Sequence, residues 1–105
     1  MGCGQKAADD YYNDVYDWFN KLNPGLRNKY ESLNSQYKSY TDKNYESLNF
    51  IFYYIQHNFF EDYEKNIFES FKKLKIHLVK YIQIHRKFLE LRKELQNFKD
   101  STGHP

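Results

Sequence analysis

The stretch from Lys65 to Lys99 reads KNIFESFKKLKIHLVKYIQIHRKFLELRKELQNFK, and the predicted fold depends on it. Its apolar side chains recur at intervals of three and four residues, which is the spacing of one face of a helix. The first half of this pattern comprises Ile67, Phe71, Leu74, Leu78 and Tyr81, and the second half comprises Ile84, Phe88, Leu91, Leu95 and Phe98. The pattern predicts one long amphipathic helix.

The register of the apolar pattern shifts between the two halves of this helix. The interval from Leu78 to Tyr81 and the next one, from Tyr81 to Ile84, are both three residues. Two successive intervals of three form a stammer in a heptad pattern, and a stammer turns the apolar stripe around the helix. We therefore expect the two halves to contact different neighbours.

Length and charge limit the possible architectures. A chain of 105 residues with one cysteine, Cys3, is a single domain without an intramolecular disulfide. Residues 1–64 carry 6 basic and 10 acidic side chains (−4), and residues 65–105 carry 10 and 4 (+6), which together give the net charge of +2. This asymmetry indicates either an anionic partner for the second half or an acidic first helix lying against a basic last one.

Capping residues divide the chain into helices. Asn23 is a favourable N-cap and Pro24 suits the first position of a helix, while Gly103 is a favourable stop. We predict an all-α fold: a flexible N-terminus (1–6), a helix over 7–22, a helix over 24–40, a long or kinked helical region over 45–99 and a tail (100–105). The region from Leu26 to Thr102 has no Gly or Pro, so breaks are expected only at 41–44 and 56–58. The long region forms either a helical hairpin or bundle, or extended coiled-coil-like helices.

The segment from Leu48 to Phe60 is apolar on nearly all sides of a helix, which indicates burial on several sides or contact with a partner. Its 13 residues are fewer than the roughly 20 that span a bilayer. The predicted helix-packing and interface residues are Leu48, Ile51, Phe52, Ile55, Phe59, Ile67, Phe71, Leu74, Leu78, Ile84, Phe88, Leu91 and Leu95.

A short repeat precedes this segment. The sequence YESLN occurs at Tyr30–Asn34 and again at Tyr45–Asn49, 15 residues later. Because 15 residues make about four helical turns, the two copies are expected to occupy nearly the same face.

The N-terminus resembles a dual-acylation signal. Gly2 can be myristoylated once Met1 is removed, and the adjacent Cys3 can be palmitoylated, which together would anchor the chain stably to a membrane. The favoured pattern has Ser or Thr at position 6, where this chain has Lys6. No secretory signal is present, so the protein is expected to be intracellular and not secreted.

The sequence offers no candidate catalytic residues, metal ligands or cofactor site. His77 and His85 lie on one stripe, but eight residues place them about 12 Å apart along a helix axis, which is too far for one metal ion. Cys3 has no nearby histidine, and no nucleophile elbow or glycine-rich phosphate loop is present. We predict a protein that is not an enzyme.

Basic residues accumulate in the second half of the chain. The candidates for contact with an anionic lipid surface are Lys72, Lys73, Lys75, Lys80, Arg86 and Lys87. Acidic side chains such as Glu90 and Glu94 alternate with the basic ones, as on a solvated helix face. Only three of the sixteen cations are arginine, the residue best suited to bidentate phosphate contact, which argues against nucleic acid as the partner.

These observations predict a non-catalytic helical interaction protein, an accessory subunit of a larger, membrane-associated assembly that binds other protein subunits through its helical seams. The alternative is a peripheral membrane adaptor acylated at Gly2 and Cys3, with its basic amphipathic helix on anionic headgroups. A nucleic-acid-binding helical protein is the third class, and it requires an affinity that falls steeply with salt.

Overall fold

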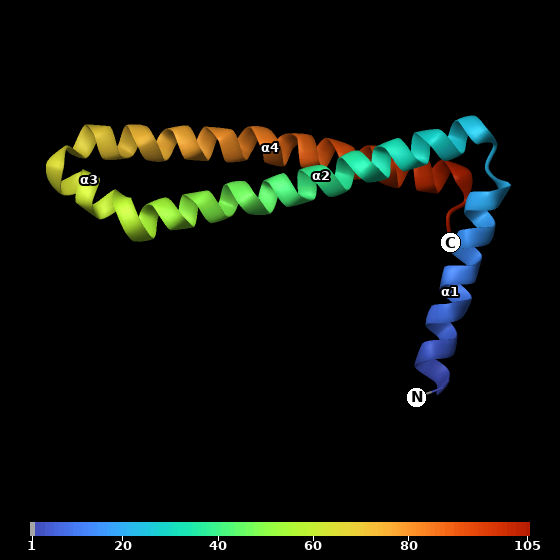
Figure 1. Ribbon diagram of the computed structural model, residues 1–105. Coiled ribbons are helices and arrows are strands. Elements are labelled where there is room, and N and C mark those ends of the chain that lie inside the picture. Colours follow the sequence, from blue (N-terminus) through green and yellow to red (C-terminus); the bar gives the residue numbers. More distant parts are fainter. Residues whose placement is uncertain (1) are drawn as a thin grey trace.

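The computed structural model describes the backbone of residues 2–105 and the side chains of residues 8–105, and over the described residues it consists of helices joined by short connections, with no strand. Helix α1 (Gly2–Lys21) leads into α2 (Pro24–Tyr54), a π-helical turn η1 (Ile55–Phe59), the short α3 (Phe60–Lys65) and α4 (Ile67–Thr102). Helices α2 and α4 lie side by side and antiparallel as a long hairpin, and α1 projects from its open end (Figure 1). The predicted all-α fold is confirmed as a helical hairpin.

Local signals set the start of α2 and the end of α4. Asn23 is extended, its Oδ1 accepts from the Leu26 N–H (2.8 Å), and Pro24 follows at the first helical position of α2. At the other end, Gly103 adopts a left-handed conformation (φ 75°), and the His104 N–H donates to the Lys99 carbonyl (3.0 Å). These two boundaries agree with the sequence. Helix α1, by contrast, begins at Gly2 instead of Ala7, and α4 extends to Thr102, beyond the predicted end at residue 99.

The chain does not reverse at 41–44, where the first break was predicted. Helix α2 runs uninterrupted through 41–44, where the Thr41 hydroxyl donates to the Tyr37 carbonyl (2.8 Å) within the helix and does not cap a new one. The region over 45–99 is instead divided by η1, which covers the second predicted break, and by Asn66. Asn66 is extended (φ −160°), and its Oδ1 accepts from the Glu69 N–H (3.2 Å), which starts α4.

The packing seam of the hairpin is continuous, which corrects the predicted stammer. On α4, the side chains that face α2 keep intervals of four and three throughout, because Ser70 and His77 take seam positions in place of apolar residues. The seam on α2 consists of Leu26, Tyr30, Leu33, Tyr37, Tyr40, Asn44, Ser47, Ile51 and Tyr54. The seam on α4 consists of Ser70, Leu74, His77, Tyr81, Ile84, Phe88, Leu91, Leu95, Phe98 and Thr102. Each of these residues is buried or half-buried.

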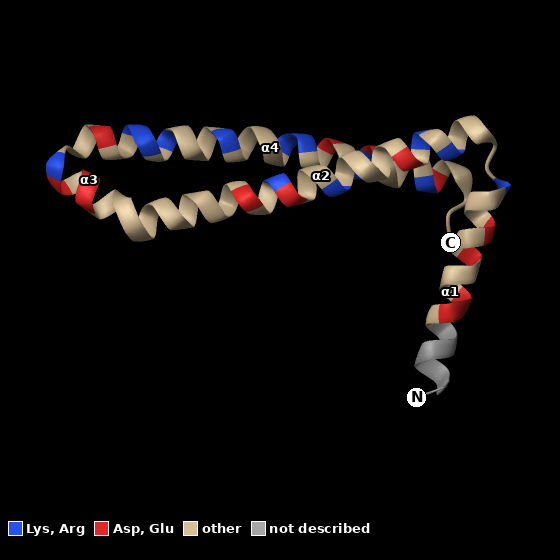
Figure 2. Ribbon diagram, in the orientation of Figure 1, with Lys and Arg blue, Asp and Glu red and all other residues tan. Residues whose placement is uncertain are grey.

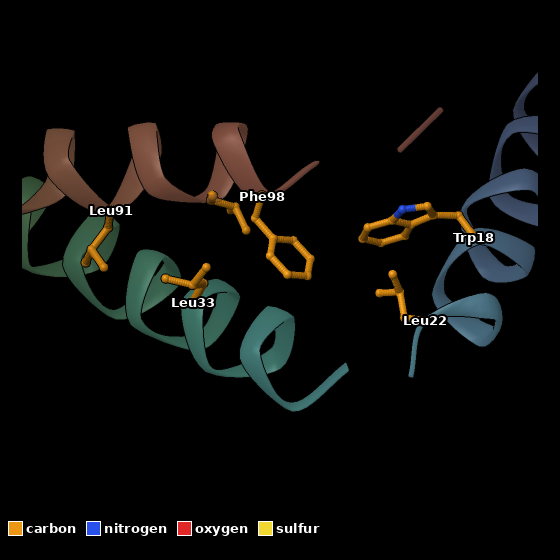
Figure 3. Packing of buried hydrophobic residues seen from close by; sticks show 6 residues of the cluster. Trp18, Leu22, Leu33, Leu91 and Phe98 are labelled. Atoms are coloured by element: carbon orange, nitrogen blue, oxygen red, sulfur yellow. The ribbon is translucent and has the colours of Figure 1, made fainter. Parts of the chain in front are cut away.

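The hydrophobic core occupies the open end of the hairpin, where three helices meet (Figure 3). Trp18 of α1 and Leu22, the residue after α1, close over Leu33 of α2 and Phe98 of α4. The indole Nε1–H of Trp18 donates to the carbonyl and hydroxyl oxygens of Thr102 (3.1 and 3.2 Å), so α1 is fixed to the end of α4. The His104 ring makes an edge-to-face contact with the Trp18 ring, with 4.6 Å between centroids. The C-terminal residues are therefore part of the packing.

Polar side chains interrupt the seam in the middle of the hairpin. His85 Nδ1 lies 2.9 Å from Asn44 Oδ1, a hydrogen bond between α4 and α2. Asn44 occupies a seam position where an apolar residue would pack better, and a polar residue there fixes the register of a helix pair. Tyr37 stacks on Phe88 on the core side of this pair, with ring centroids 5.3 Å apart.

The hairpin is one helix thick. The molecule measures 61 × 38 × 16 Å, and a single helix with its side chains is about 10–12 Å across. No second layer of helices covers either broad face of α2 and α4 among the described residues. Both faces are therefore open to solvent, although domains usually bury a core between two layers.

Candidate interaction surface

The two broad faces of the hairpin differ in chemistry. One face, which we call the cationic face, carries Lys43 and Phe50 of α2 beside Lys80 of α4. The Lys80 ammonium lies over the Phe50 ring (6.0 Å to the centroid), which shows that these flanks of α2 and α4 share one side of the hairpin. Because α2 and α4 are antiparallel, the flank of each helix that points away from the cationic face lies on the other broad side of the hairpin.

That other side is apolar toward the turn, and we call it the apolar flank. On α2 the large side chains follow intervals of three and four residues next to the packing seam, and on α4 two intervals are seven residues because Lys75 and His85 occupy the intermediate positions. They are Tyr45, Leu48 and Phe52 on α2, Ile55 at the start of η1, and Phe68, Phe71, Leu78, Ile82 and Leu89 on α4. Leu48 and Ile55 are half-buried, and the other seven side chains are exposed. Phe68 is the most exposed of them, at 86%. Monomeric proteins rarely expose so extended an apolar surface.

The predicted interface residues divide between the seam and this flank. The seam contains Ile51, Leu74, Ile84, Phe88, Leu91 and Leu95, and the flank contains Leu48, Phe52, Ile55, Phe71 and Leu78. Phe59 and Ile67 lie at the turn. Tyr45, Phe68, Ile82 and Leu89 of the flank were not predicted from the sequence. Positions 68, 71, 75, 78, 82, 85 and 89 follow intervals of three and four residues and would form one stripe. Lys75 and His85 occupy two of these positions and interrupt the apolar pattern.

Aromatic rings hold the turn at the closed end of the hairpin. Phe59 of η1 contacts the Phe71 ring of α4 at 5.5 Å between centroids, and Tyr63 of α3 contacts both rings. The π-helical turn is the one departure from α-helical winding between Pro24 and Lys65, and such turns are frequent at functional sites. It places Phe59 against α4 and leaves the neighbouring Phe60 65% exposed.

A polar cluster lies beside these rings. The Tyr54 hydroxyl donates to Asp62 Oδ2 (2.9 Å), and the Lys73 ammonium approaches the same oxygen (3.3 Å). Burial raises the pKa of Tyr54 to about 12, and its hydrogen bond to Asp62 acts in the same direction. The same hydrogen bond lowers the pKa of Asp62, with a further contribution from Lys73. Ser70, fully buried, leaves room for the Tyr54 ring between the helices.

We expect Tyr54→Phe to raise the pKa of Asp62 by more than Lys73→Met does, because the hydroxyl is the larger cause of the lowered value. A lowered carboxyl pKa stabilises the fold at pH values above the unfolded pKa of about 3.9, and this contribution disappears as the pH falls through the folded pKa. A carboxyl-carbon NMR titration of Asp62 measures the rise of its pKa in both variants. A larger rise in Lys73→Met than in Tyr54→Phe would contradict the prediction.

The predicted lipid-contact residues do not form one patch. Lys73, Lys80 and Lys87 lie along the cationic face, Lys72 and Arg86 lie on the outer edge of α4, and Lys75 lies within the apolar flank. Figure 2 shows the basic residues spread along α4 and acidic residues on α1. Two of the cationic-face lysines have ion-pair partners, Lys73 with Asp62 (3.3 Å) and Lys87 with Glu90 (3.9 Å).

Three further expectations concern acylation at Gly2 and Cys3, metal binding and membrane-spanning helices. Gly2 and Cys3 lie outside the residues whose side chains the structure describes. Within the described residues, no group of three potential ligands is placed to hold a metal ion. None of the described helices combines the length and the apolar character needed to cross a bilayer.

Comparisons with protein-family models, with curated proteins and with solved structures find no match for this chain.

Proposed function

We propose that this chain is a non-catalytic helical interaction protein that serves as an accessory subunit of a larger, membrane-associated assembly inside the cell. The observation that carries the proposal is the apolar flank. Nine large side chains in heptad-like spacing run along both helices of a hairpin that has no second layer of its own. In this proposal the hairpin is an antiparallel coiled coil, and another protein surface covers the flank.

The pattern of the flank supports a helical partner. Intervals of three and four residues form a straight stripe along a helix, and a partner helix fills such a stripe with side chains of the same spacing. The flank also adjoins the packing seam, so a docked helix would extend the existing core without rearranging α2 or α4. The cationic face carries Lys43 and Lys80 beside the exposed ring of Phe50, and its lysines are suited to remain in water or to lie near anionic groups.

A peripheral membrane adaptor is the second candidate. The basic charge of α4, with Lys72, Lys75, Lys80 and Arg86 exposed, favours attraction to anionic headgroups. Acylation of Gly2 and Cys3 would provide the anchor, because one acyl chain alone binds a membrane only marginally. This candidate differs from the first in requiring added mass on the chain.

The native size of the untagged protein from its own source tests both candidates. We expect it to migrate with a large complex on a sizing gradient in mild detergent, with an unmodified intact mass. Leu78→Glu, on the apolar flank, should shift the chain to a small species. A small species that carries acyl mass would instead establish the adaptor.

The matched control is Ile76→Glu. Ile76 is 61% exposed on the same helix but outside the apolar flank, so the same charge there should leave the chain in the complex. If the wild-type chain migrates alone and unmodified, or if both variants behave alike, the proposed function is wrong.

A further inference from the structure

We infer that the apolar flank is covered by a second copy of this chain, so that two hairpins form a four-helix bundle. The inference rests on the proposed function for the idea that the flank is an interface, and it adds the identity of the partner. In the proposed arrangement, a two-fold axis runs along the length of the hairpin between the two flanks. Helix α2 of one copy then lies antiparallel on α4 of the other.

The register within one chain determines which residues would meet. Four contacts fix the level of α2 relative to α4: Tyr37 with Phe88, Asn44 with His85, Phe50 with Lys80, and Tyr54 with His77. A two-fold axis parallel to the helices preserves these levels between copies. Phe52 of one copy is then about level with Leu78 of the other, and Tyr45 lies near Ile82.

Shape complementarity follows from this register. The exposed positions on α2 are aromatic (Tyr45 and Phe52), whereas those opposite them on α4 are aliphatic (Leu78 and Ile82). Large rings therefore face smaller side chains on both sides of the axis, as interdigitated cores require. Each helix also offers the bundle two adjacent stripes, one for its own hairpin and one for the second copy.

The available area is adequate for a dimer. Tyr45, Phe52 and the five flank residues of α4 are all exposed by 41% or more. At on the order of 100 Å² per side chain, these seven offer roughly 700 Å² per copy, close to the about 800 Å² per partner of a stable interface.

Charge at the rim is also complementary. Asp42 of α2 and Arg86 of α4 are both exposed at the outer edge of the flank, at levels set by the neighbouring Asn44 and His85. The three ion pairs recorded between described side chains involve neither residue. In the dimer, Asp42 of each copy lies beside Arg86 of the other, which gives two equivalent ion pairs related by the axis.

The experiment is a charge exchange in the purified full chain, followed by sedimentation equilibrium over a range of protein concentrations. We expect the wild type to dimerise, and Asp42→Arg and Arg86→Asp each to weaken the dimer about tenfold, because each creates two like-charge pairs. A mixture of the two variants should recover an affinity close to that of the wild type, because the mixed dimer has two opposite-charge pairs, one with the original charges and one with the charges exchanged.

Ile82→Glu and Ile76→Glu provide an independent arm. Ile82 is 45% exposed on the flank and Ile76 is 61% exposed outside it, so neither substitution should unfold the monomer, which circular dichroism checks. We expect Ile82→Glu to abolish dimerisation and Ile76→Glu to leave it unchanged. A monomeric wild type, including one that binds anionic vesicles as a monomer, overturns the inference. A dimer insensitive to Ile82→Glu, or mixed variants no tighter than each alone, also overturns it.

The two proposals can fail separately. If the purified chain is monomeric but still migrates with a large complex in its source, and Leu78→Glu releases it, the flank binds a different protein and the proposed function stands. If the purified chain dimerises with the expected charge dependence but migrates alone in its source, the dimer stands and the accessory-subunit function is wrong.

Discussion

Leu91→Ala is expected to lower the free energy of unfolding by about 3 kcal/mol, because it removes a fully buried side chain from the centre of the core. Leu91 is 1% exposed and lies in the cluster with Leu33 and Leu95. The hairpin is one layer thick, so few other residues are available to fill the resulting cavity. For a domain of this size such a loss is a large share of the total stability.

Urea denaturation followed by helical circular dichroism measures this effect, at one protein concentration for all variants, since self-association would shift the midpoint. Ile76→Ala is the matched control, because it removes a similar volume from an exposed position on the same helix. We expect that control to change stability by no more than about 0.5 kcal/mol. Equal effects of the two substitutions would show that Leu91 does not occupy the core of the protein in solution.

Trp18→Ala is expected to detach α1 from the hairpin, at a cost of about 3 kcal/mol or more. The indole contacts rings on α2, α4 and the C-terminal residues: Tyr30 at 5.1 Å, Phe98 at 6.3 Å and His104 at 4.6 Å between centroids. It is also the hydrogen-bond donor to Thr102. Without these contacts, α1 is an isolated helix of 20 residues, which is only marginally stable in water.

The measurement is the helical signal under native conditions. Because α1 holds 20 of the 105 residues, its unfolding should remove up to about one fifth of the signal. Trp18→Phe keeps a ring but loses the Nε1–H donor, and we expect it to cost about 1 kcal/mol without loss of helix. Tyr16→Ala, at an exposed position of the same helix, should have little effect. Unchanged helicity and stability in Trp18→Ala would contradict the docking of α1.

The candidate surface could be predicted only in part. The segment from Leu48 to Phe60 carries apolar residues on several sides, so contact with more than one neighbour was predictable. Which residues face outward was not, because each helix has two adjacent stripes of similar apolar character. On α4 the apolar pattern favoured Phe71 and Leu78 as packing residues, yet the hairpin packs through Ser70 and His77.

The YESLN repeat shows the same difficulty. Fifteen residues exceed four turns of an α-helix by about 60°, so the expectation of one shared face was wrong. In the first copy Tyr30 and Leu33 face α4, whereas in the second copy Ser47 faces α4 and Tyr45 and Leu48 turn to the apolar flank. The same five residues therefore contribute to the core once and to the open surface once.

The sequence by itself determined the helical class, the start of α2 at Asn23 and Pro24, Gly103 as a stop residue and the unbroken course of α4, although it placed the last helical residue at 99 instead of Thr102. These are local properties, because capping and periodicity act within one or two turns of helix. Only the tertiary structure decided which of the two predicted breaks reverses the chain, namely the one at 56–58, and that polar residues occupy the seam. The reason is that a seam position is defined by the helix opposite it, and the Tyr54–Asp62 hydrogen bond and the Asn44–His85 pair exist only after α2 and α4 come together.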